Sequence, residues 1–296
     1  MNKKVSIIIP FAAVTLQNRG HLNNRSTDDL DFVILTTIEV IKNINNVLAN
    51  IDKEILLVDN THNFPNISMP NLKIIKGWQG LDGTSINDYI NQYDIDYLDN
   101  HTMWASMAYN AGIEQAMGDY IILQHNDIFY HENFIEEMIE TMREQELEYI
   151  TADFKRLSLS GYIANKKEID SLVDDIEFTH YDGGYLKTKK FGVADAYFFL
   201  TKKSFFNDYY VDWKYGDTNH GATIKCLKEN KKFLHLQPFY DNPNFKTDNR
   251  DRTYKWNGKR LCTHLKGGFS EAKMTNKENG EFHDFFNRLI NLGQYD

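Results

Sequence analysis

The stretch from Asn110 to Glu140, NAGIEQAMGDYIILQHNDIFYHENFIEEMIE, decides the fold that we expect for this chain. It contains the end of a helix, a glycine stop at Gly118 and then the continuous apolar run Tyr120–Leu123. A second helix follows, and its apolar face consists of Phe134, Ile135, Met138 and Ile139. A short, uninterrupted apolar run between two helices is typical of a buried parallel strand. The stretch therefore predicts a central strand of an α/β fold.

A polar cluster follows this strand directly, and it contains His125, Asn126 and Asp127. In open α/β sheets, ligands bind at the carboxyl ends of the parallel strands. Side chains at positions i and i+2 of a strand point the same way. His125 and Asp127 are therefore placed so that one cation could contact both.

Apolar runs and helical patterns alternate along most of the rest of the chain. We expect further strands at residues 5–9, 54–58, 72–75, 149–152 and 233–236, and another strand with a helix start within 191–206. Further helices are expected at residues 30–50, 103–116 and 222–230. This alternation predicts a Rossmann-like α/β fold with a mostly parallel central sheet.

Composition and charge exclude several classes of function for this 296-residue chain. Its net charge of -9 argues against nucleic acid as a partner, because phosphate binding needs a basic surface. A nucleotide bound through a metal ion remains compatible with that charge. The apolar run near the N-terminus breaks at Pro10, too early for a signal peptide or a transmembrane segment. We expect a cytoplasmic protein in which Cys226 and Cys262 are free thiols.

The order of the motifs resembles that of the family 2 glycosyltransferases with the GT-A fold. Their segment N-x-G-x-x-x-A-x-G-x-Y-I is matched by Asn110, Gly112, Ala116, Gly118, Tyr120 and Ile121. An acidic signature follows in that family, and here the corresponding residues are His125, Asn126 and Asp127. The histidine at the first position is a departure, whereas the final aspartate is kept. The resemblance implies a three-layer GT-A sandwich and the transfer of sugars from nucleotide sugars.

Nucleotide-binding residues follow from the same resemblance. Pro10 and Phe11 begin the loop that would surround the base, and Asp59 would accept a hydrogen bond from a uracil ring. Asn110 and Asn126 complete the expected nucleotide-binding set. For Asp59 an alternative from the residues alone is a turn closed by the aspartate side chain at the end of its strand.

A metal site is implied at Asp127, with His125 or His264 as further ligands. His264 lies in the segment 262–268, which resembles the C-terminal segment whose histidine completes the metal site in some GT-A enzymes. The expected cofactor is Mn²⁺ or Mg²⁺, and imidazole ligands favour Mn²⁺.

The catalytic base is expected to be Asp217, or else Asp195. Asp217 occupies the place where inverting relatives carry the carboxylate that deprotonates the acceptor. The alternative for Asp217 is a helix N-cap. Asp195 interrupts an apolar strand, so its charge must be paired or face a cavity.

The expected function is a metal-dependent transferase that moves a hexosyl or N-acetylhexosaminyl group from a UDP-sugar to a glycan or lipid-linked acceptor. The GT-A domain would cover residues 1–240, with a nucleotide-binding half at 1–128 and an acceptor half at 129–240. Residues 241–296 would form an extension that closes over the active site. We expect it to act in polysaccharide biosynthesis in the cytoplasm, free or peripheral to a membrane. Three alternatives remain: a nucleotidyltransferase, an inactive transferase-like binding protein, and a purely structural fold in which these polar residues only form turns at strand ends.

Overall fold

The computed structural model describes residues 4–11, 28–62, 64–77, 101–151, 155–156, 192–194, 196–211, 218–236, 238–239 and 251–265. The first half contains β1 (Val5–Phe11), α1 (Asp28–Val47), β2 (Lys53–Asp59), β3 (Leu72–Lys76), α3 (His101–Gln115), β4 (Tyr120–Gln124), β5 (Ile128–Tyr130) and α4 (Ile135–Glu144). The second half contains β6 (Leu147–Thr151), β7 (Lys155–Arg156), β8 (Gly192–Val193), β9 (Phe198–Lys202), η4 (Lys203–Asn207), α6 (His220–Lys228) and β10 (Lys232–His235). Three C-terminal strands follow, β11 (Pro238–Phe239), β12 (Asp251–Trp256) and β13 (Lys259–Leu265).

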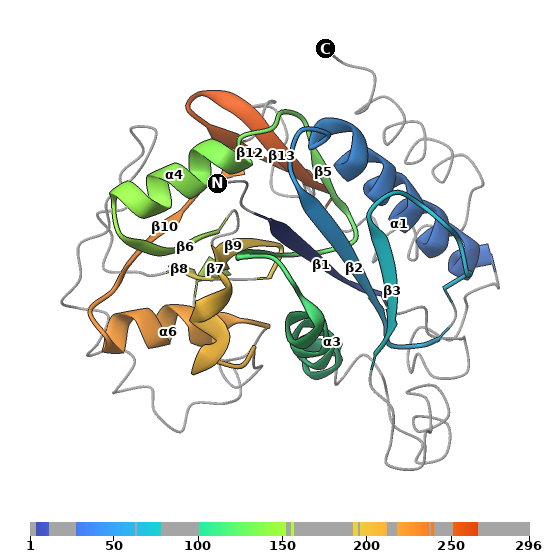
Figure 1. Cartoon of the computed structure of the whole chain (residues 1–296), viewed down its shortest axis with the longest axis horizontal. Coiled ribbons are helices and arrows are strands. Elements are labelled where there is room, and N and C mark those ends of the chain that lie inside the picture. Colours follow the sequence, from blue (N-terminus) through green and yellow to red (C-terminus); the bar gives the residue numbers. More distant parts are fainter. Residues whose placement is uncertain are drawn as a thin grey trace.

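A seven-stranded sheet in the order β10-β6-β9-β4-β1-β2-β3 forms the middle of the molecule (Figure 1). Strands β4, β1, β2 and β3 run parallel to one another, and β10 runs parallel to β6. Only β9 is antiparallel to its neighbours β4 and β6 within this sheet. The predicted α/β class with a mostly parallel central sheet is confirmed.

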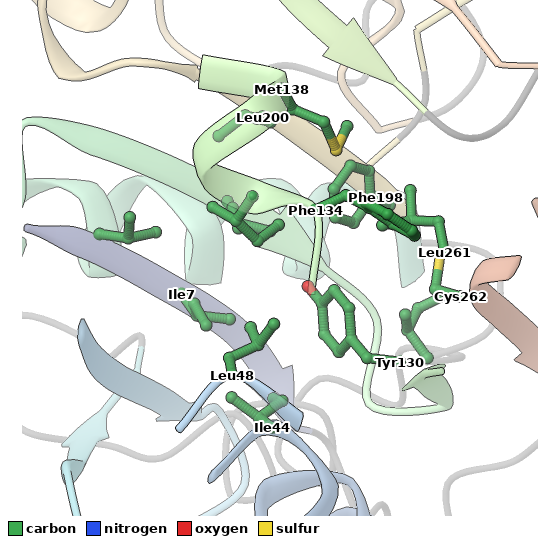
Figure 2. Close-up of a cluster of buried hydrophobic side chains, with 14 of the residues drawn as sticks. Ile7, Ile44, Leu48, Tyr130, Phe134, Met138, Phe198, Leu200, Leu261 and Cys262 are labelled. Atoms are coloured by element: carbon green, nitrogen blue, oxygen red, sulfur yellow. The ribbon is translucent and has the colours of Figure 1, made fainter. Parts of the chain in front are cut away.

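Two hydrophobic clusters cover the two faces of this sheet. In β1, Ile7 and Ile9 belong to one cluster and Ile8 to the other, because successive strand residues point to opposite faces. The first cluster contains the buried sides of α1 and α4, and the second contains those of α3 and α6. Figure 2 shows the first cluster, in which residues from α1, α4, β1, β5, β9 and β13 meet. The result is the expected three-layer arrangement.

The first strand is longer than expected, since β1 continues through Pro10 to Phe11. The backbone oxygen of Phe11 accepts a hydrogen bond from the N–H of Asn60, just beyond β2. The backbone polar groups of Phe11 therefore point toward β2, and those of Pro10 point away from it. Pairing with β4 already ends at Ile8. The missing N–H of Pro10 therefore removes no bond from the ladder, and the strand tolerates the proline.

A close backbone approach explains the glycine at the end of the α3 segment. A Cβ atom on Gly118 would lie 2.6 Å from the backbone nitrogen of Ser6 and 2.8 Å from the oxygen of Lys4. The N–H of Gly118 donates instead to the hydroxyl of Ser6 at 2.8 Å. This contact lets the chain enter β4 directly beside the start of β1.

The C-terminal region, expected to form an extension, contains an antiparallel hairpin. Strands β12 and β13 pair with each other, and β13 pairs with β5 in a four-stranded sheet of order β11-β12-β13-β5. Asn257 and Gly258 both have positive φ, 48° and 79°, as a tight hairpin turn requires. Tyr254, Trp256, Leu261 and Cys262 of the hairpin are buried in the first cluster. The strand expected at residues 233–236 is β10, which lies at the edge of the large sheet.

Candidate metal centre

The turn between β4 and β5 contains His125 and Asp127, and buried polar contacts hold it in place. The hydroxyl of Tyr130 donates to Oε1 of Gln124 at 2.7 Å, which links the two strands across the turn. The backbone N–H of His125 donates to the oxygen of Tyr197 at 3.1 Å. The turn is therefore anchored on both sides, to β5 and to the segment that leads into β9.

The third residue of the site, His264, comes from a segment far away in the sequence. In the pairing of β13 with β5, His264 lies opposite Ile128, the residue that follows Asp127. On the other side of β13, the hydroxyl of Thr263 contacts Nε2 of His131 at 2.7 Å and the hydroxyl of Thr253 at 2.8 Å. The hairpin is the element that brings His264 to the end of β4.

These three side chains converge, and their possible ligand atoms all lie within 4.8 Å of one another. Oδ1 of Asp127 is 3.3 Å from Nε2 of His264 and 4.0 Å from Nδ1 of His125. A divalent ion with bonds of about 2.1 Å separates its adjacent ligand atoms by about 3 Å and opposite ones by about 4 Å. Within the described residues, this is the one group of three or more His, Cys, Asp or Glu side chains that could hold a metal ion.

Burial makes these ligands costly to leave unpaired. Asp127 and His264 are buried, whereas the side chain of His125 is 31% exposed. Among the residues that the structure describes, Nδ1 of His264 has no hydrogen-bond partner, and the neighbours of Oδ1 of Asp127 are the two imidazoles. A buried polar atom without a partner costs free energy, and such an atom needs an explanation such as a bound ion. The donor set of two imidazoles and one carboxylate fits a divalent transition metal.

The charge state of Asp127 is also suited to a cation. Burial acts to raise the pKa of Asp127, but the charge of His264, its contact with the carboxylate and the charge of His125 together outweigh burial. The pKa of Asp127 therefore lies below its ordinary value, and the carboxylate is ionised at neutral pH.

The residues expected to bind a nucleotide have surroundings that differ from those of the three candidate metal ligands. Asp59 is buried, its Oδ1 accepts from the N–H and hydroxyl of Thr61 at 3.0 and 3.2 Å, and its Oδ2 accepts from the N–H of Phe64 at 2.8 Å. These hydrogen bonds form the turn, closed by the aspartate side chain at the end of its strand, that the sequence offered as the alternative role of Asp59. Phe11 is fully buried and packs edge-on against Phe64, with ring centroids 4.8 Å apart, whereas Pro10 is half-buried.

The two asparagines expected at the nucleotide also differ from each other. The side chain of Asn110 donates to the oxygen of Val211 at 2.8 Å and accepts from its N–H at 2.9 Å. These two hydrogen bonds to the backbone of Val211 connect α3 to the segment after η4. Asn110 therefore stabilises the fold. Asn126 is half-buried and donates to the hydroxyl of Thr37 in α1 at 3.1 Å. The expected bases Asp195 and Asp217 lie outside the described residues.

The residues that sequence reasoning missed are those that place His264, above all the turn Asn257–Gly258. This dipeptide lies between Tyr254 and Trp256 on one side and Leu261 on the other, and it is a strong hairpin signal. Tyr197, which contacts both imidazole rings, was also missed. Its place opposite His125 depends on the antiparallel pairing of β9 with β4, which the sequence pattern does not reveal.

Residues 82–210 match the model of a family described as glycosyl transferase family 2. This segment includes His125, Asp127 and Tyr197. The match and the sheet topology confirm the predicted GT-A fold and the resemblance to family 2. No curated protein matches the sequence.

Several solved structures are similar to this chain at low sequence identity. TarS residues 1–349 from S. aureus, in complex with UDP, is 13% identical over 79% of this chain and 60% of that chain, with a TM-score of 0.41. Mannosyltransferase PcManGT from Pyrobaculum calidifontis, in complex with GDP-Man and Mn²⁺, is 8% identical over 79% and 55%, also at 0.41. Glucosyl-3-phosphoglycerate synthase of M. tuberculosis is 9% identical over 82% and 74%, at 0.40. This chain spans 55 to 60% of the length of the first two.

Proposed function

We propose that this chain is a metal-dependent glycosyltransferase that takes a sugar from a UDP-sugar and transfers it to a hydroxyl group of a glycan or lipid-linked acceptor. The observation that carries the proposal is the convergence of His125, Asp127 and His264 at the carboxyl end of β4. Two of these residues lie inside the segment that matches family 2, and the third is brought there by the hairpin. This edge of the sheet is where parallel α/β proteins bind their ligands.

The three residues would hold Mn²⁺ or Mg²⁺, and the two imidazoles favour Mn²⁺ because Mg²⁺ prefers oxygen ligands. When bound, the ion would neutralise the negative charge that builds on the departing diphosphate. The burial of Asp127 and His264 keeps water away from the charges and so strengthens their attraction to a cation.

Nucleotide contacts would come from groups at the same edge. Asn126 is half-buried beside Asp127, and the amide oxygen of such a side chain can accept a hydrogen bond from a nucleotide. Asp59 could accept a bond from a base in addition to those within its turn, because each carboxylate oxygen has two lone pairs. Pro10 and the backbone of Phe11 would border the base.

On the acceptor side, we propose Asp217 as the base, with Asp195 as the second candidate. In an inverting transfer, the acceptor oxygen bonds to the anomeric carbon and the bond from that carbon to the diphosphate breaks. The acceptor proton passes to the aspartate. The sugar moved is a hexose or an N-acetylhexosamine, and polysaccharide biosynthesis in the cytoplasm is the proposed setting. Among the described residues, no helix combines the length and apolar character needed to cross a bilayer.

The proposal is tested by incubating the chain with UDP-glucose, UDP-N-acetylglucosamine and GDP-mannose in the presence of mixed glycan acceptors. We expect release of the nucleoside diphosphate to require Mn²⁺, to be fastest with a UDP-sugar and to be lost in Asp127→Asn. UDP binding without release from any donor would instead support a transferase-like binding protein. Release that is unchanged by chelation would contradict the metal dependence.

A further inference from the structure

Tyr197 lies directly opposite His125 in the ladder formed by β4 and β9. In this antiparallel pairing Gln124 is opposite Phe198, so the next pair outward is His125 and Tyr197. The backbone hydrogen bond from His125 to the oxygen of Tyr197 closes that pair. Side chains of directly opposite residues project from the same face of a sheet, with their Cβ atoms about 5 Å apart.

The ring of Tyr197 contacts both imidazole rings of the candidate metal centre. Its centroid is 4.2 Å from that of His125, with an angle of 59° between the planes. It is 4.1 Å from that of His264, with an angle of 41°. The two imidazoles are 5.8 Å apart and nearly perpendicular, at 85°. Tyr197 thus packs closely against two rings that come from distant parts of the chain.

Ring orientation decides whether an imidazole can bind a metal ion, because each nitrogen lone pair lies in the ring plane. The side-chain torsion that turns this plane is broad and only weakly restricted by the backbone. A packed aromatic neighbour restricts it, so the ligands lose less freedom when an ion binds. A tyrosine face also attracts positive charge, and an imidazole becomes more positive when it binds a metal.

We propose that Tyr197 is a positioning residue that holds the rings of His125 and His264 in the orientation for binding a divalent transition metal. This inference rests on the metal centre proposed above. It assigns a part in metal binding to the residue directly before β9, so the site depends on three separate segments: the β4–β5 turn, the hairpin and the segment that leads into β9.

The test is calorimetric titration of Mn²⁺ into the wild type, Tyr197→Phe and Tyr197→Leu. We expect Tyr197→Phe to keep its affinity within about threefold, since the ring remains, and Tyr197→Leu to lose about 10- to 100-fold. Tyr210→Leu is the control, because Tyr210 lies beyond η4 and its side chain is 70% exposed. Circular dichroism of the metal-free variants checks that they are folded. Should Tyr197→Leu be unfolded, Tyr197→Gln replaces it, since Tyr197 is only half-buried.

The visible absorption spectrum of bound Co²⁺ gives a second readout that reports ligand geometry. We expect the spectra of the wild type and Tyr197→Phe to agree and that of the ring-free variant to change. Wild-type affinity and an unchanged spectrum without the ring would overturn the inference, as would an equal loss in Tyr197→Phe. A wild type that binds neither Mn²⁺ nor Co²⁺ would overturn the metal centre itself.

Discussion

Asp59 and Asp127 lie in similar places but in contrasting surroundings. Both are buried, and both lie at the carboxyl end of a strand that runs parallel to β1. The oxygens of Asp59 accept hydrogen bonds from Thr61 and Phe64, whereas Oδ1 of Asp127 has no such partner within the described residues. Asp127 faces two imidazoles instead. A buried strand-end aspartate thus stabilises a turn where its chain supplies donors, and is suited to an ion where it does not.

The largest effect is expected for Asp127→Asn, which keeps the shape of the side chain but removes its charge. We expect Mn²⁺ affinity to fall at least about 100-fold, or roughly 3 kcal/mol, because the anionic ligand is lost. The unfolding free energy of the metal-free chain should fall by about 1 kcal/mol, because the carboxylate loses its ion-pair contacts with the two imidazoles. Calorimetry and urea unfolding measure the two quantities. A large loss of stability with unchanged Mn²⁺ affinity would break the comparison.

The reverse result is expected for Asp59→Ala. This change leaves the N–H groups of Thr61 and Phe64 without their acceptor, so the unfolding free energy should fall by about 2–3 kcal/mol. The Mn²⁺ affinity of the folded protein should stay within about twofold of the wild type. Asp59→Asn is the matched control, because its amide oxygen can still accept one of these bonds. Full stability together with lost UDP binding would show that Asp59 serves the nucleotide and not the turn.

The asparagines sharpen the same comparison at a smaller scale. Asn110→Ala removes both bonds to Val211, and we expect a loss of about 1–2 kcal/mol in unfolding free energy. Asn126→Ala removes one hydrogen bond, to the hydroxyl of Thr37. We expect the unfolding free energy to fall by less than about 1 kcal/mol. Urea unfolding of both variants checks the order. If Asn126→Ala were the more destabilising change, the assignment of Asn110 to the fold would be wrong.

The smallest effect concerns pH. Because the pKa of Asp127 is lowered in the folded chain, the stability that its carboxylate contributes is present above its ordinary pKa and is lost only as the pH falls through the lowered value. Between pH 7 and 6 the carboxylate therefore stays ionised, and we expect the difference in unfolding free energy between the wild type and Asp127→Asn to stay constant within about 0.5 kcal/mol. Urea unfolding at both pH values measures this difference, and a difference that shrinks over the interval would contradict the lowered pKa.

Much of the central sheet could be predicted because its strands are uninterrupted apolar runs that are long enough to recognise. The runs at Val5–Ile9 and Tyr120–Leu123 became β1 and β4 with small shifts at their ends. No strand was predicted for the hairpin of β12 and β13, because its many lysines and arginines obscure the apolar pattern of a strand, although Asn257–Gly258 marks its turn. In a hairpin only one face needs to be buried, so charged residues alternate with Tyr254 and Trp256.

The candidate site was predictable in part. His125 and Asp127 follow from their spacing after a buried strand, and His264 was implied by the family resemblance; the structure brings the three together. The contrast between Asp59 and Asp127 could not be predicted, because it depends on where the N–H groups of Thr61 and Phe64 point. Such differences of a few ångströms depend on the whole turn and not on its residue types.

The most direct test of the central claim is calorimetric titration of UDP, with and without Mn²⁺, into the wild type and Asp127→Ala. The metal centre at the end of β4 predicts UDP binding that requires Mn²⁺ and disappears in the variant. UDP binding that is indifferent to both Mn²⁺ and the loss of Asp127 would contradict the placement of the nucleotide and metal at this edge of the sheet.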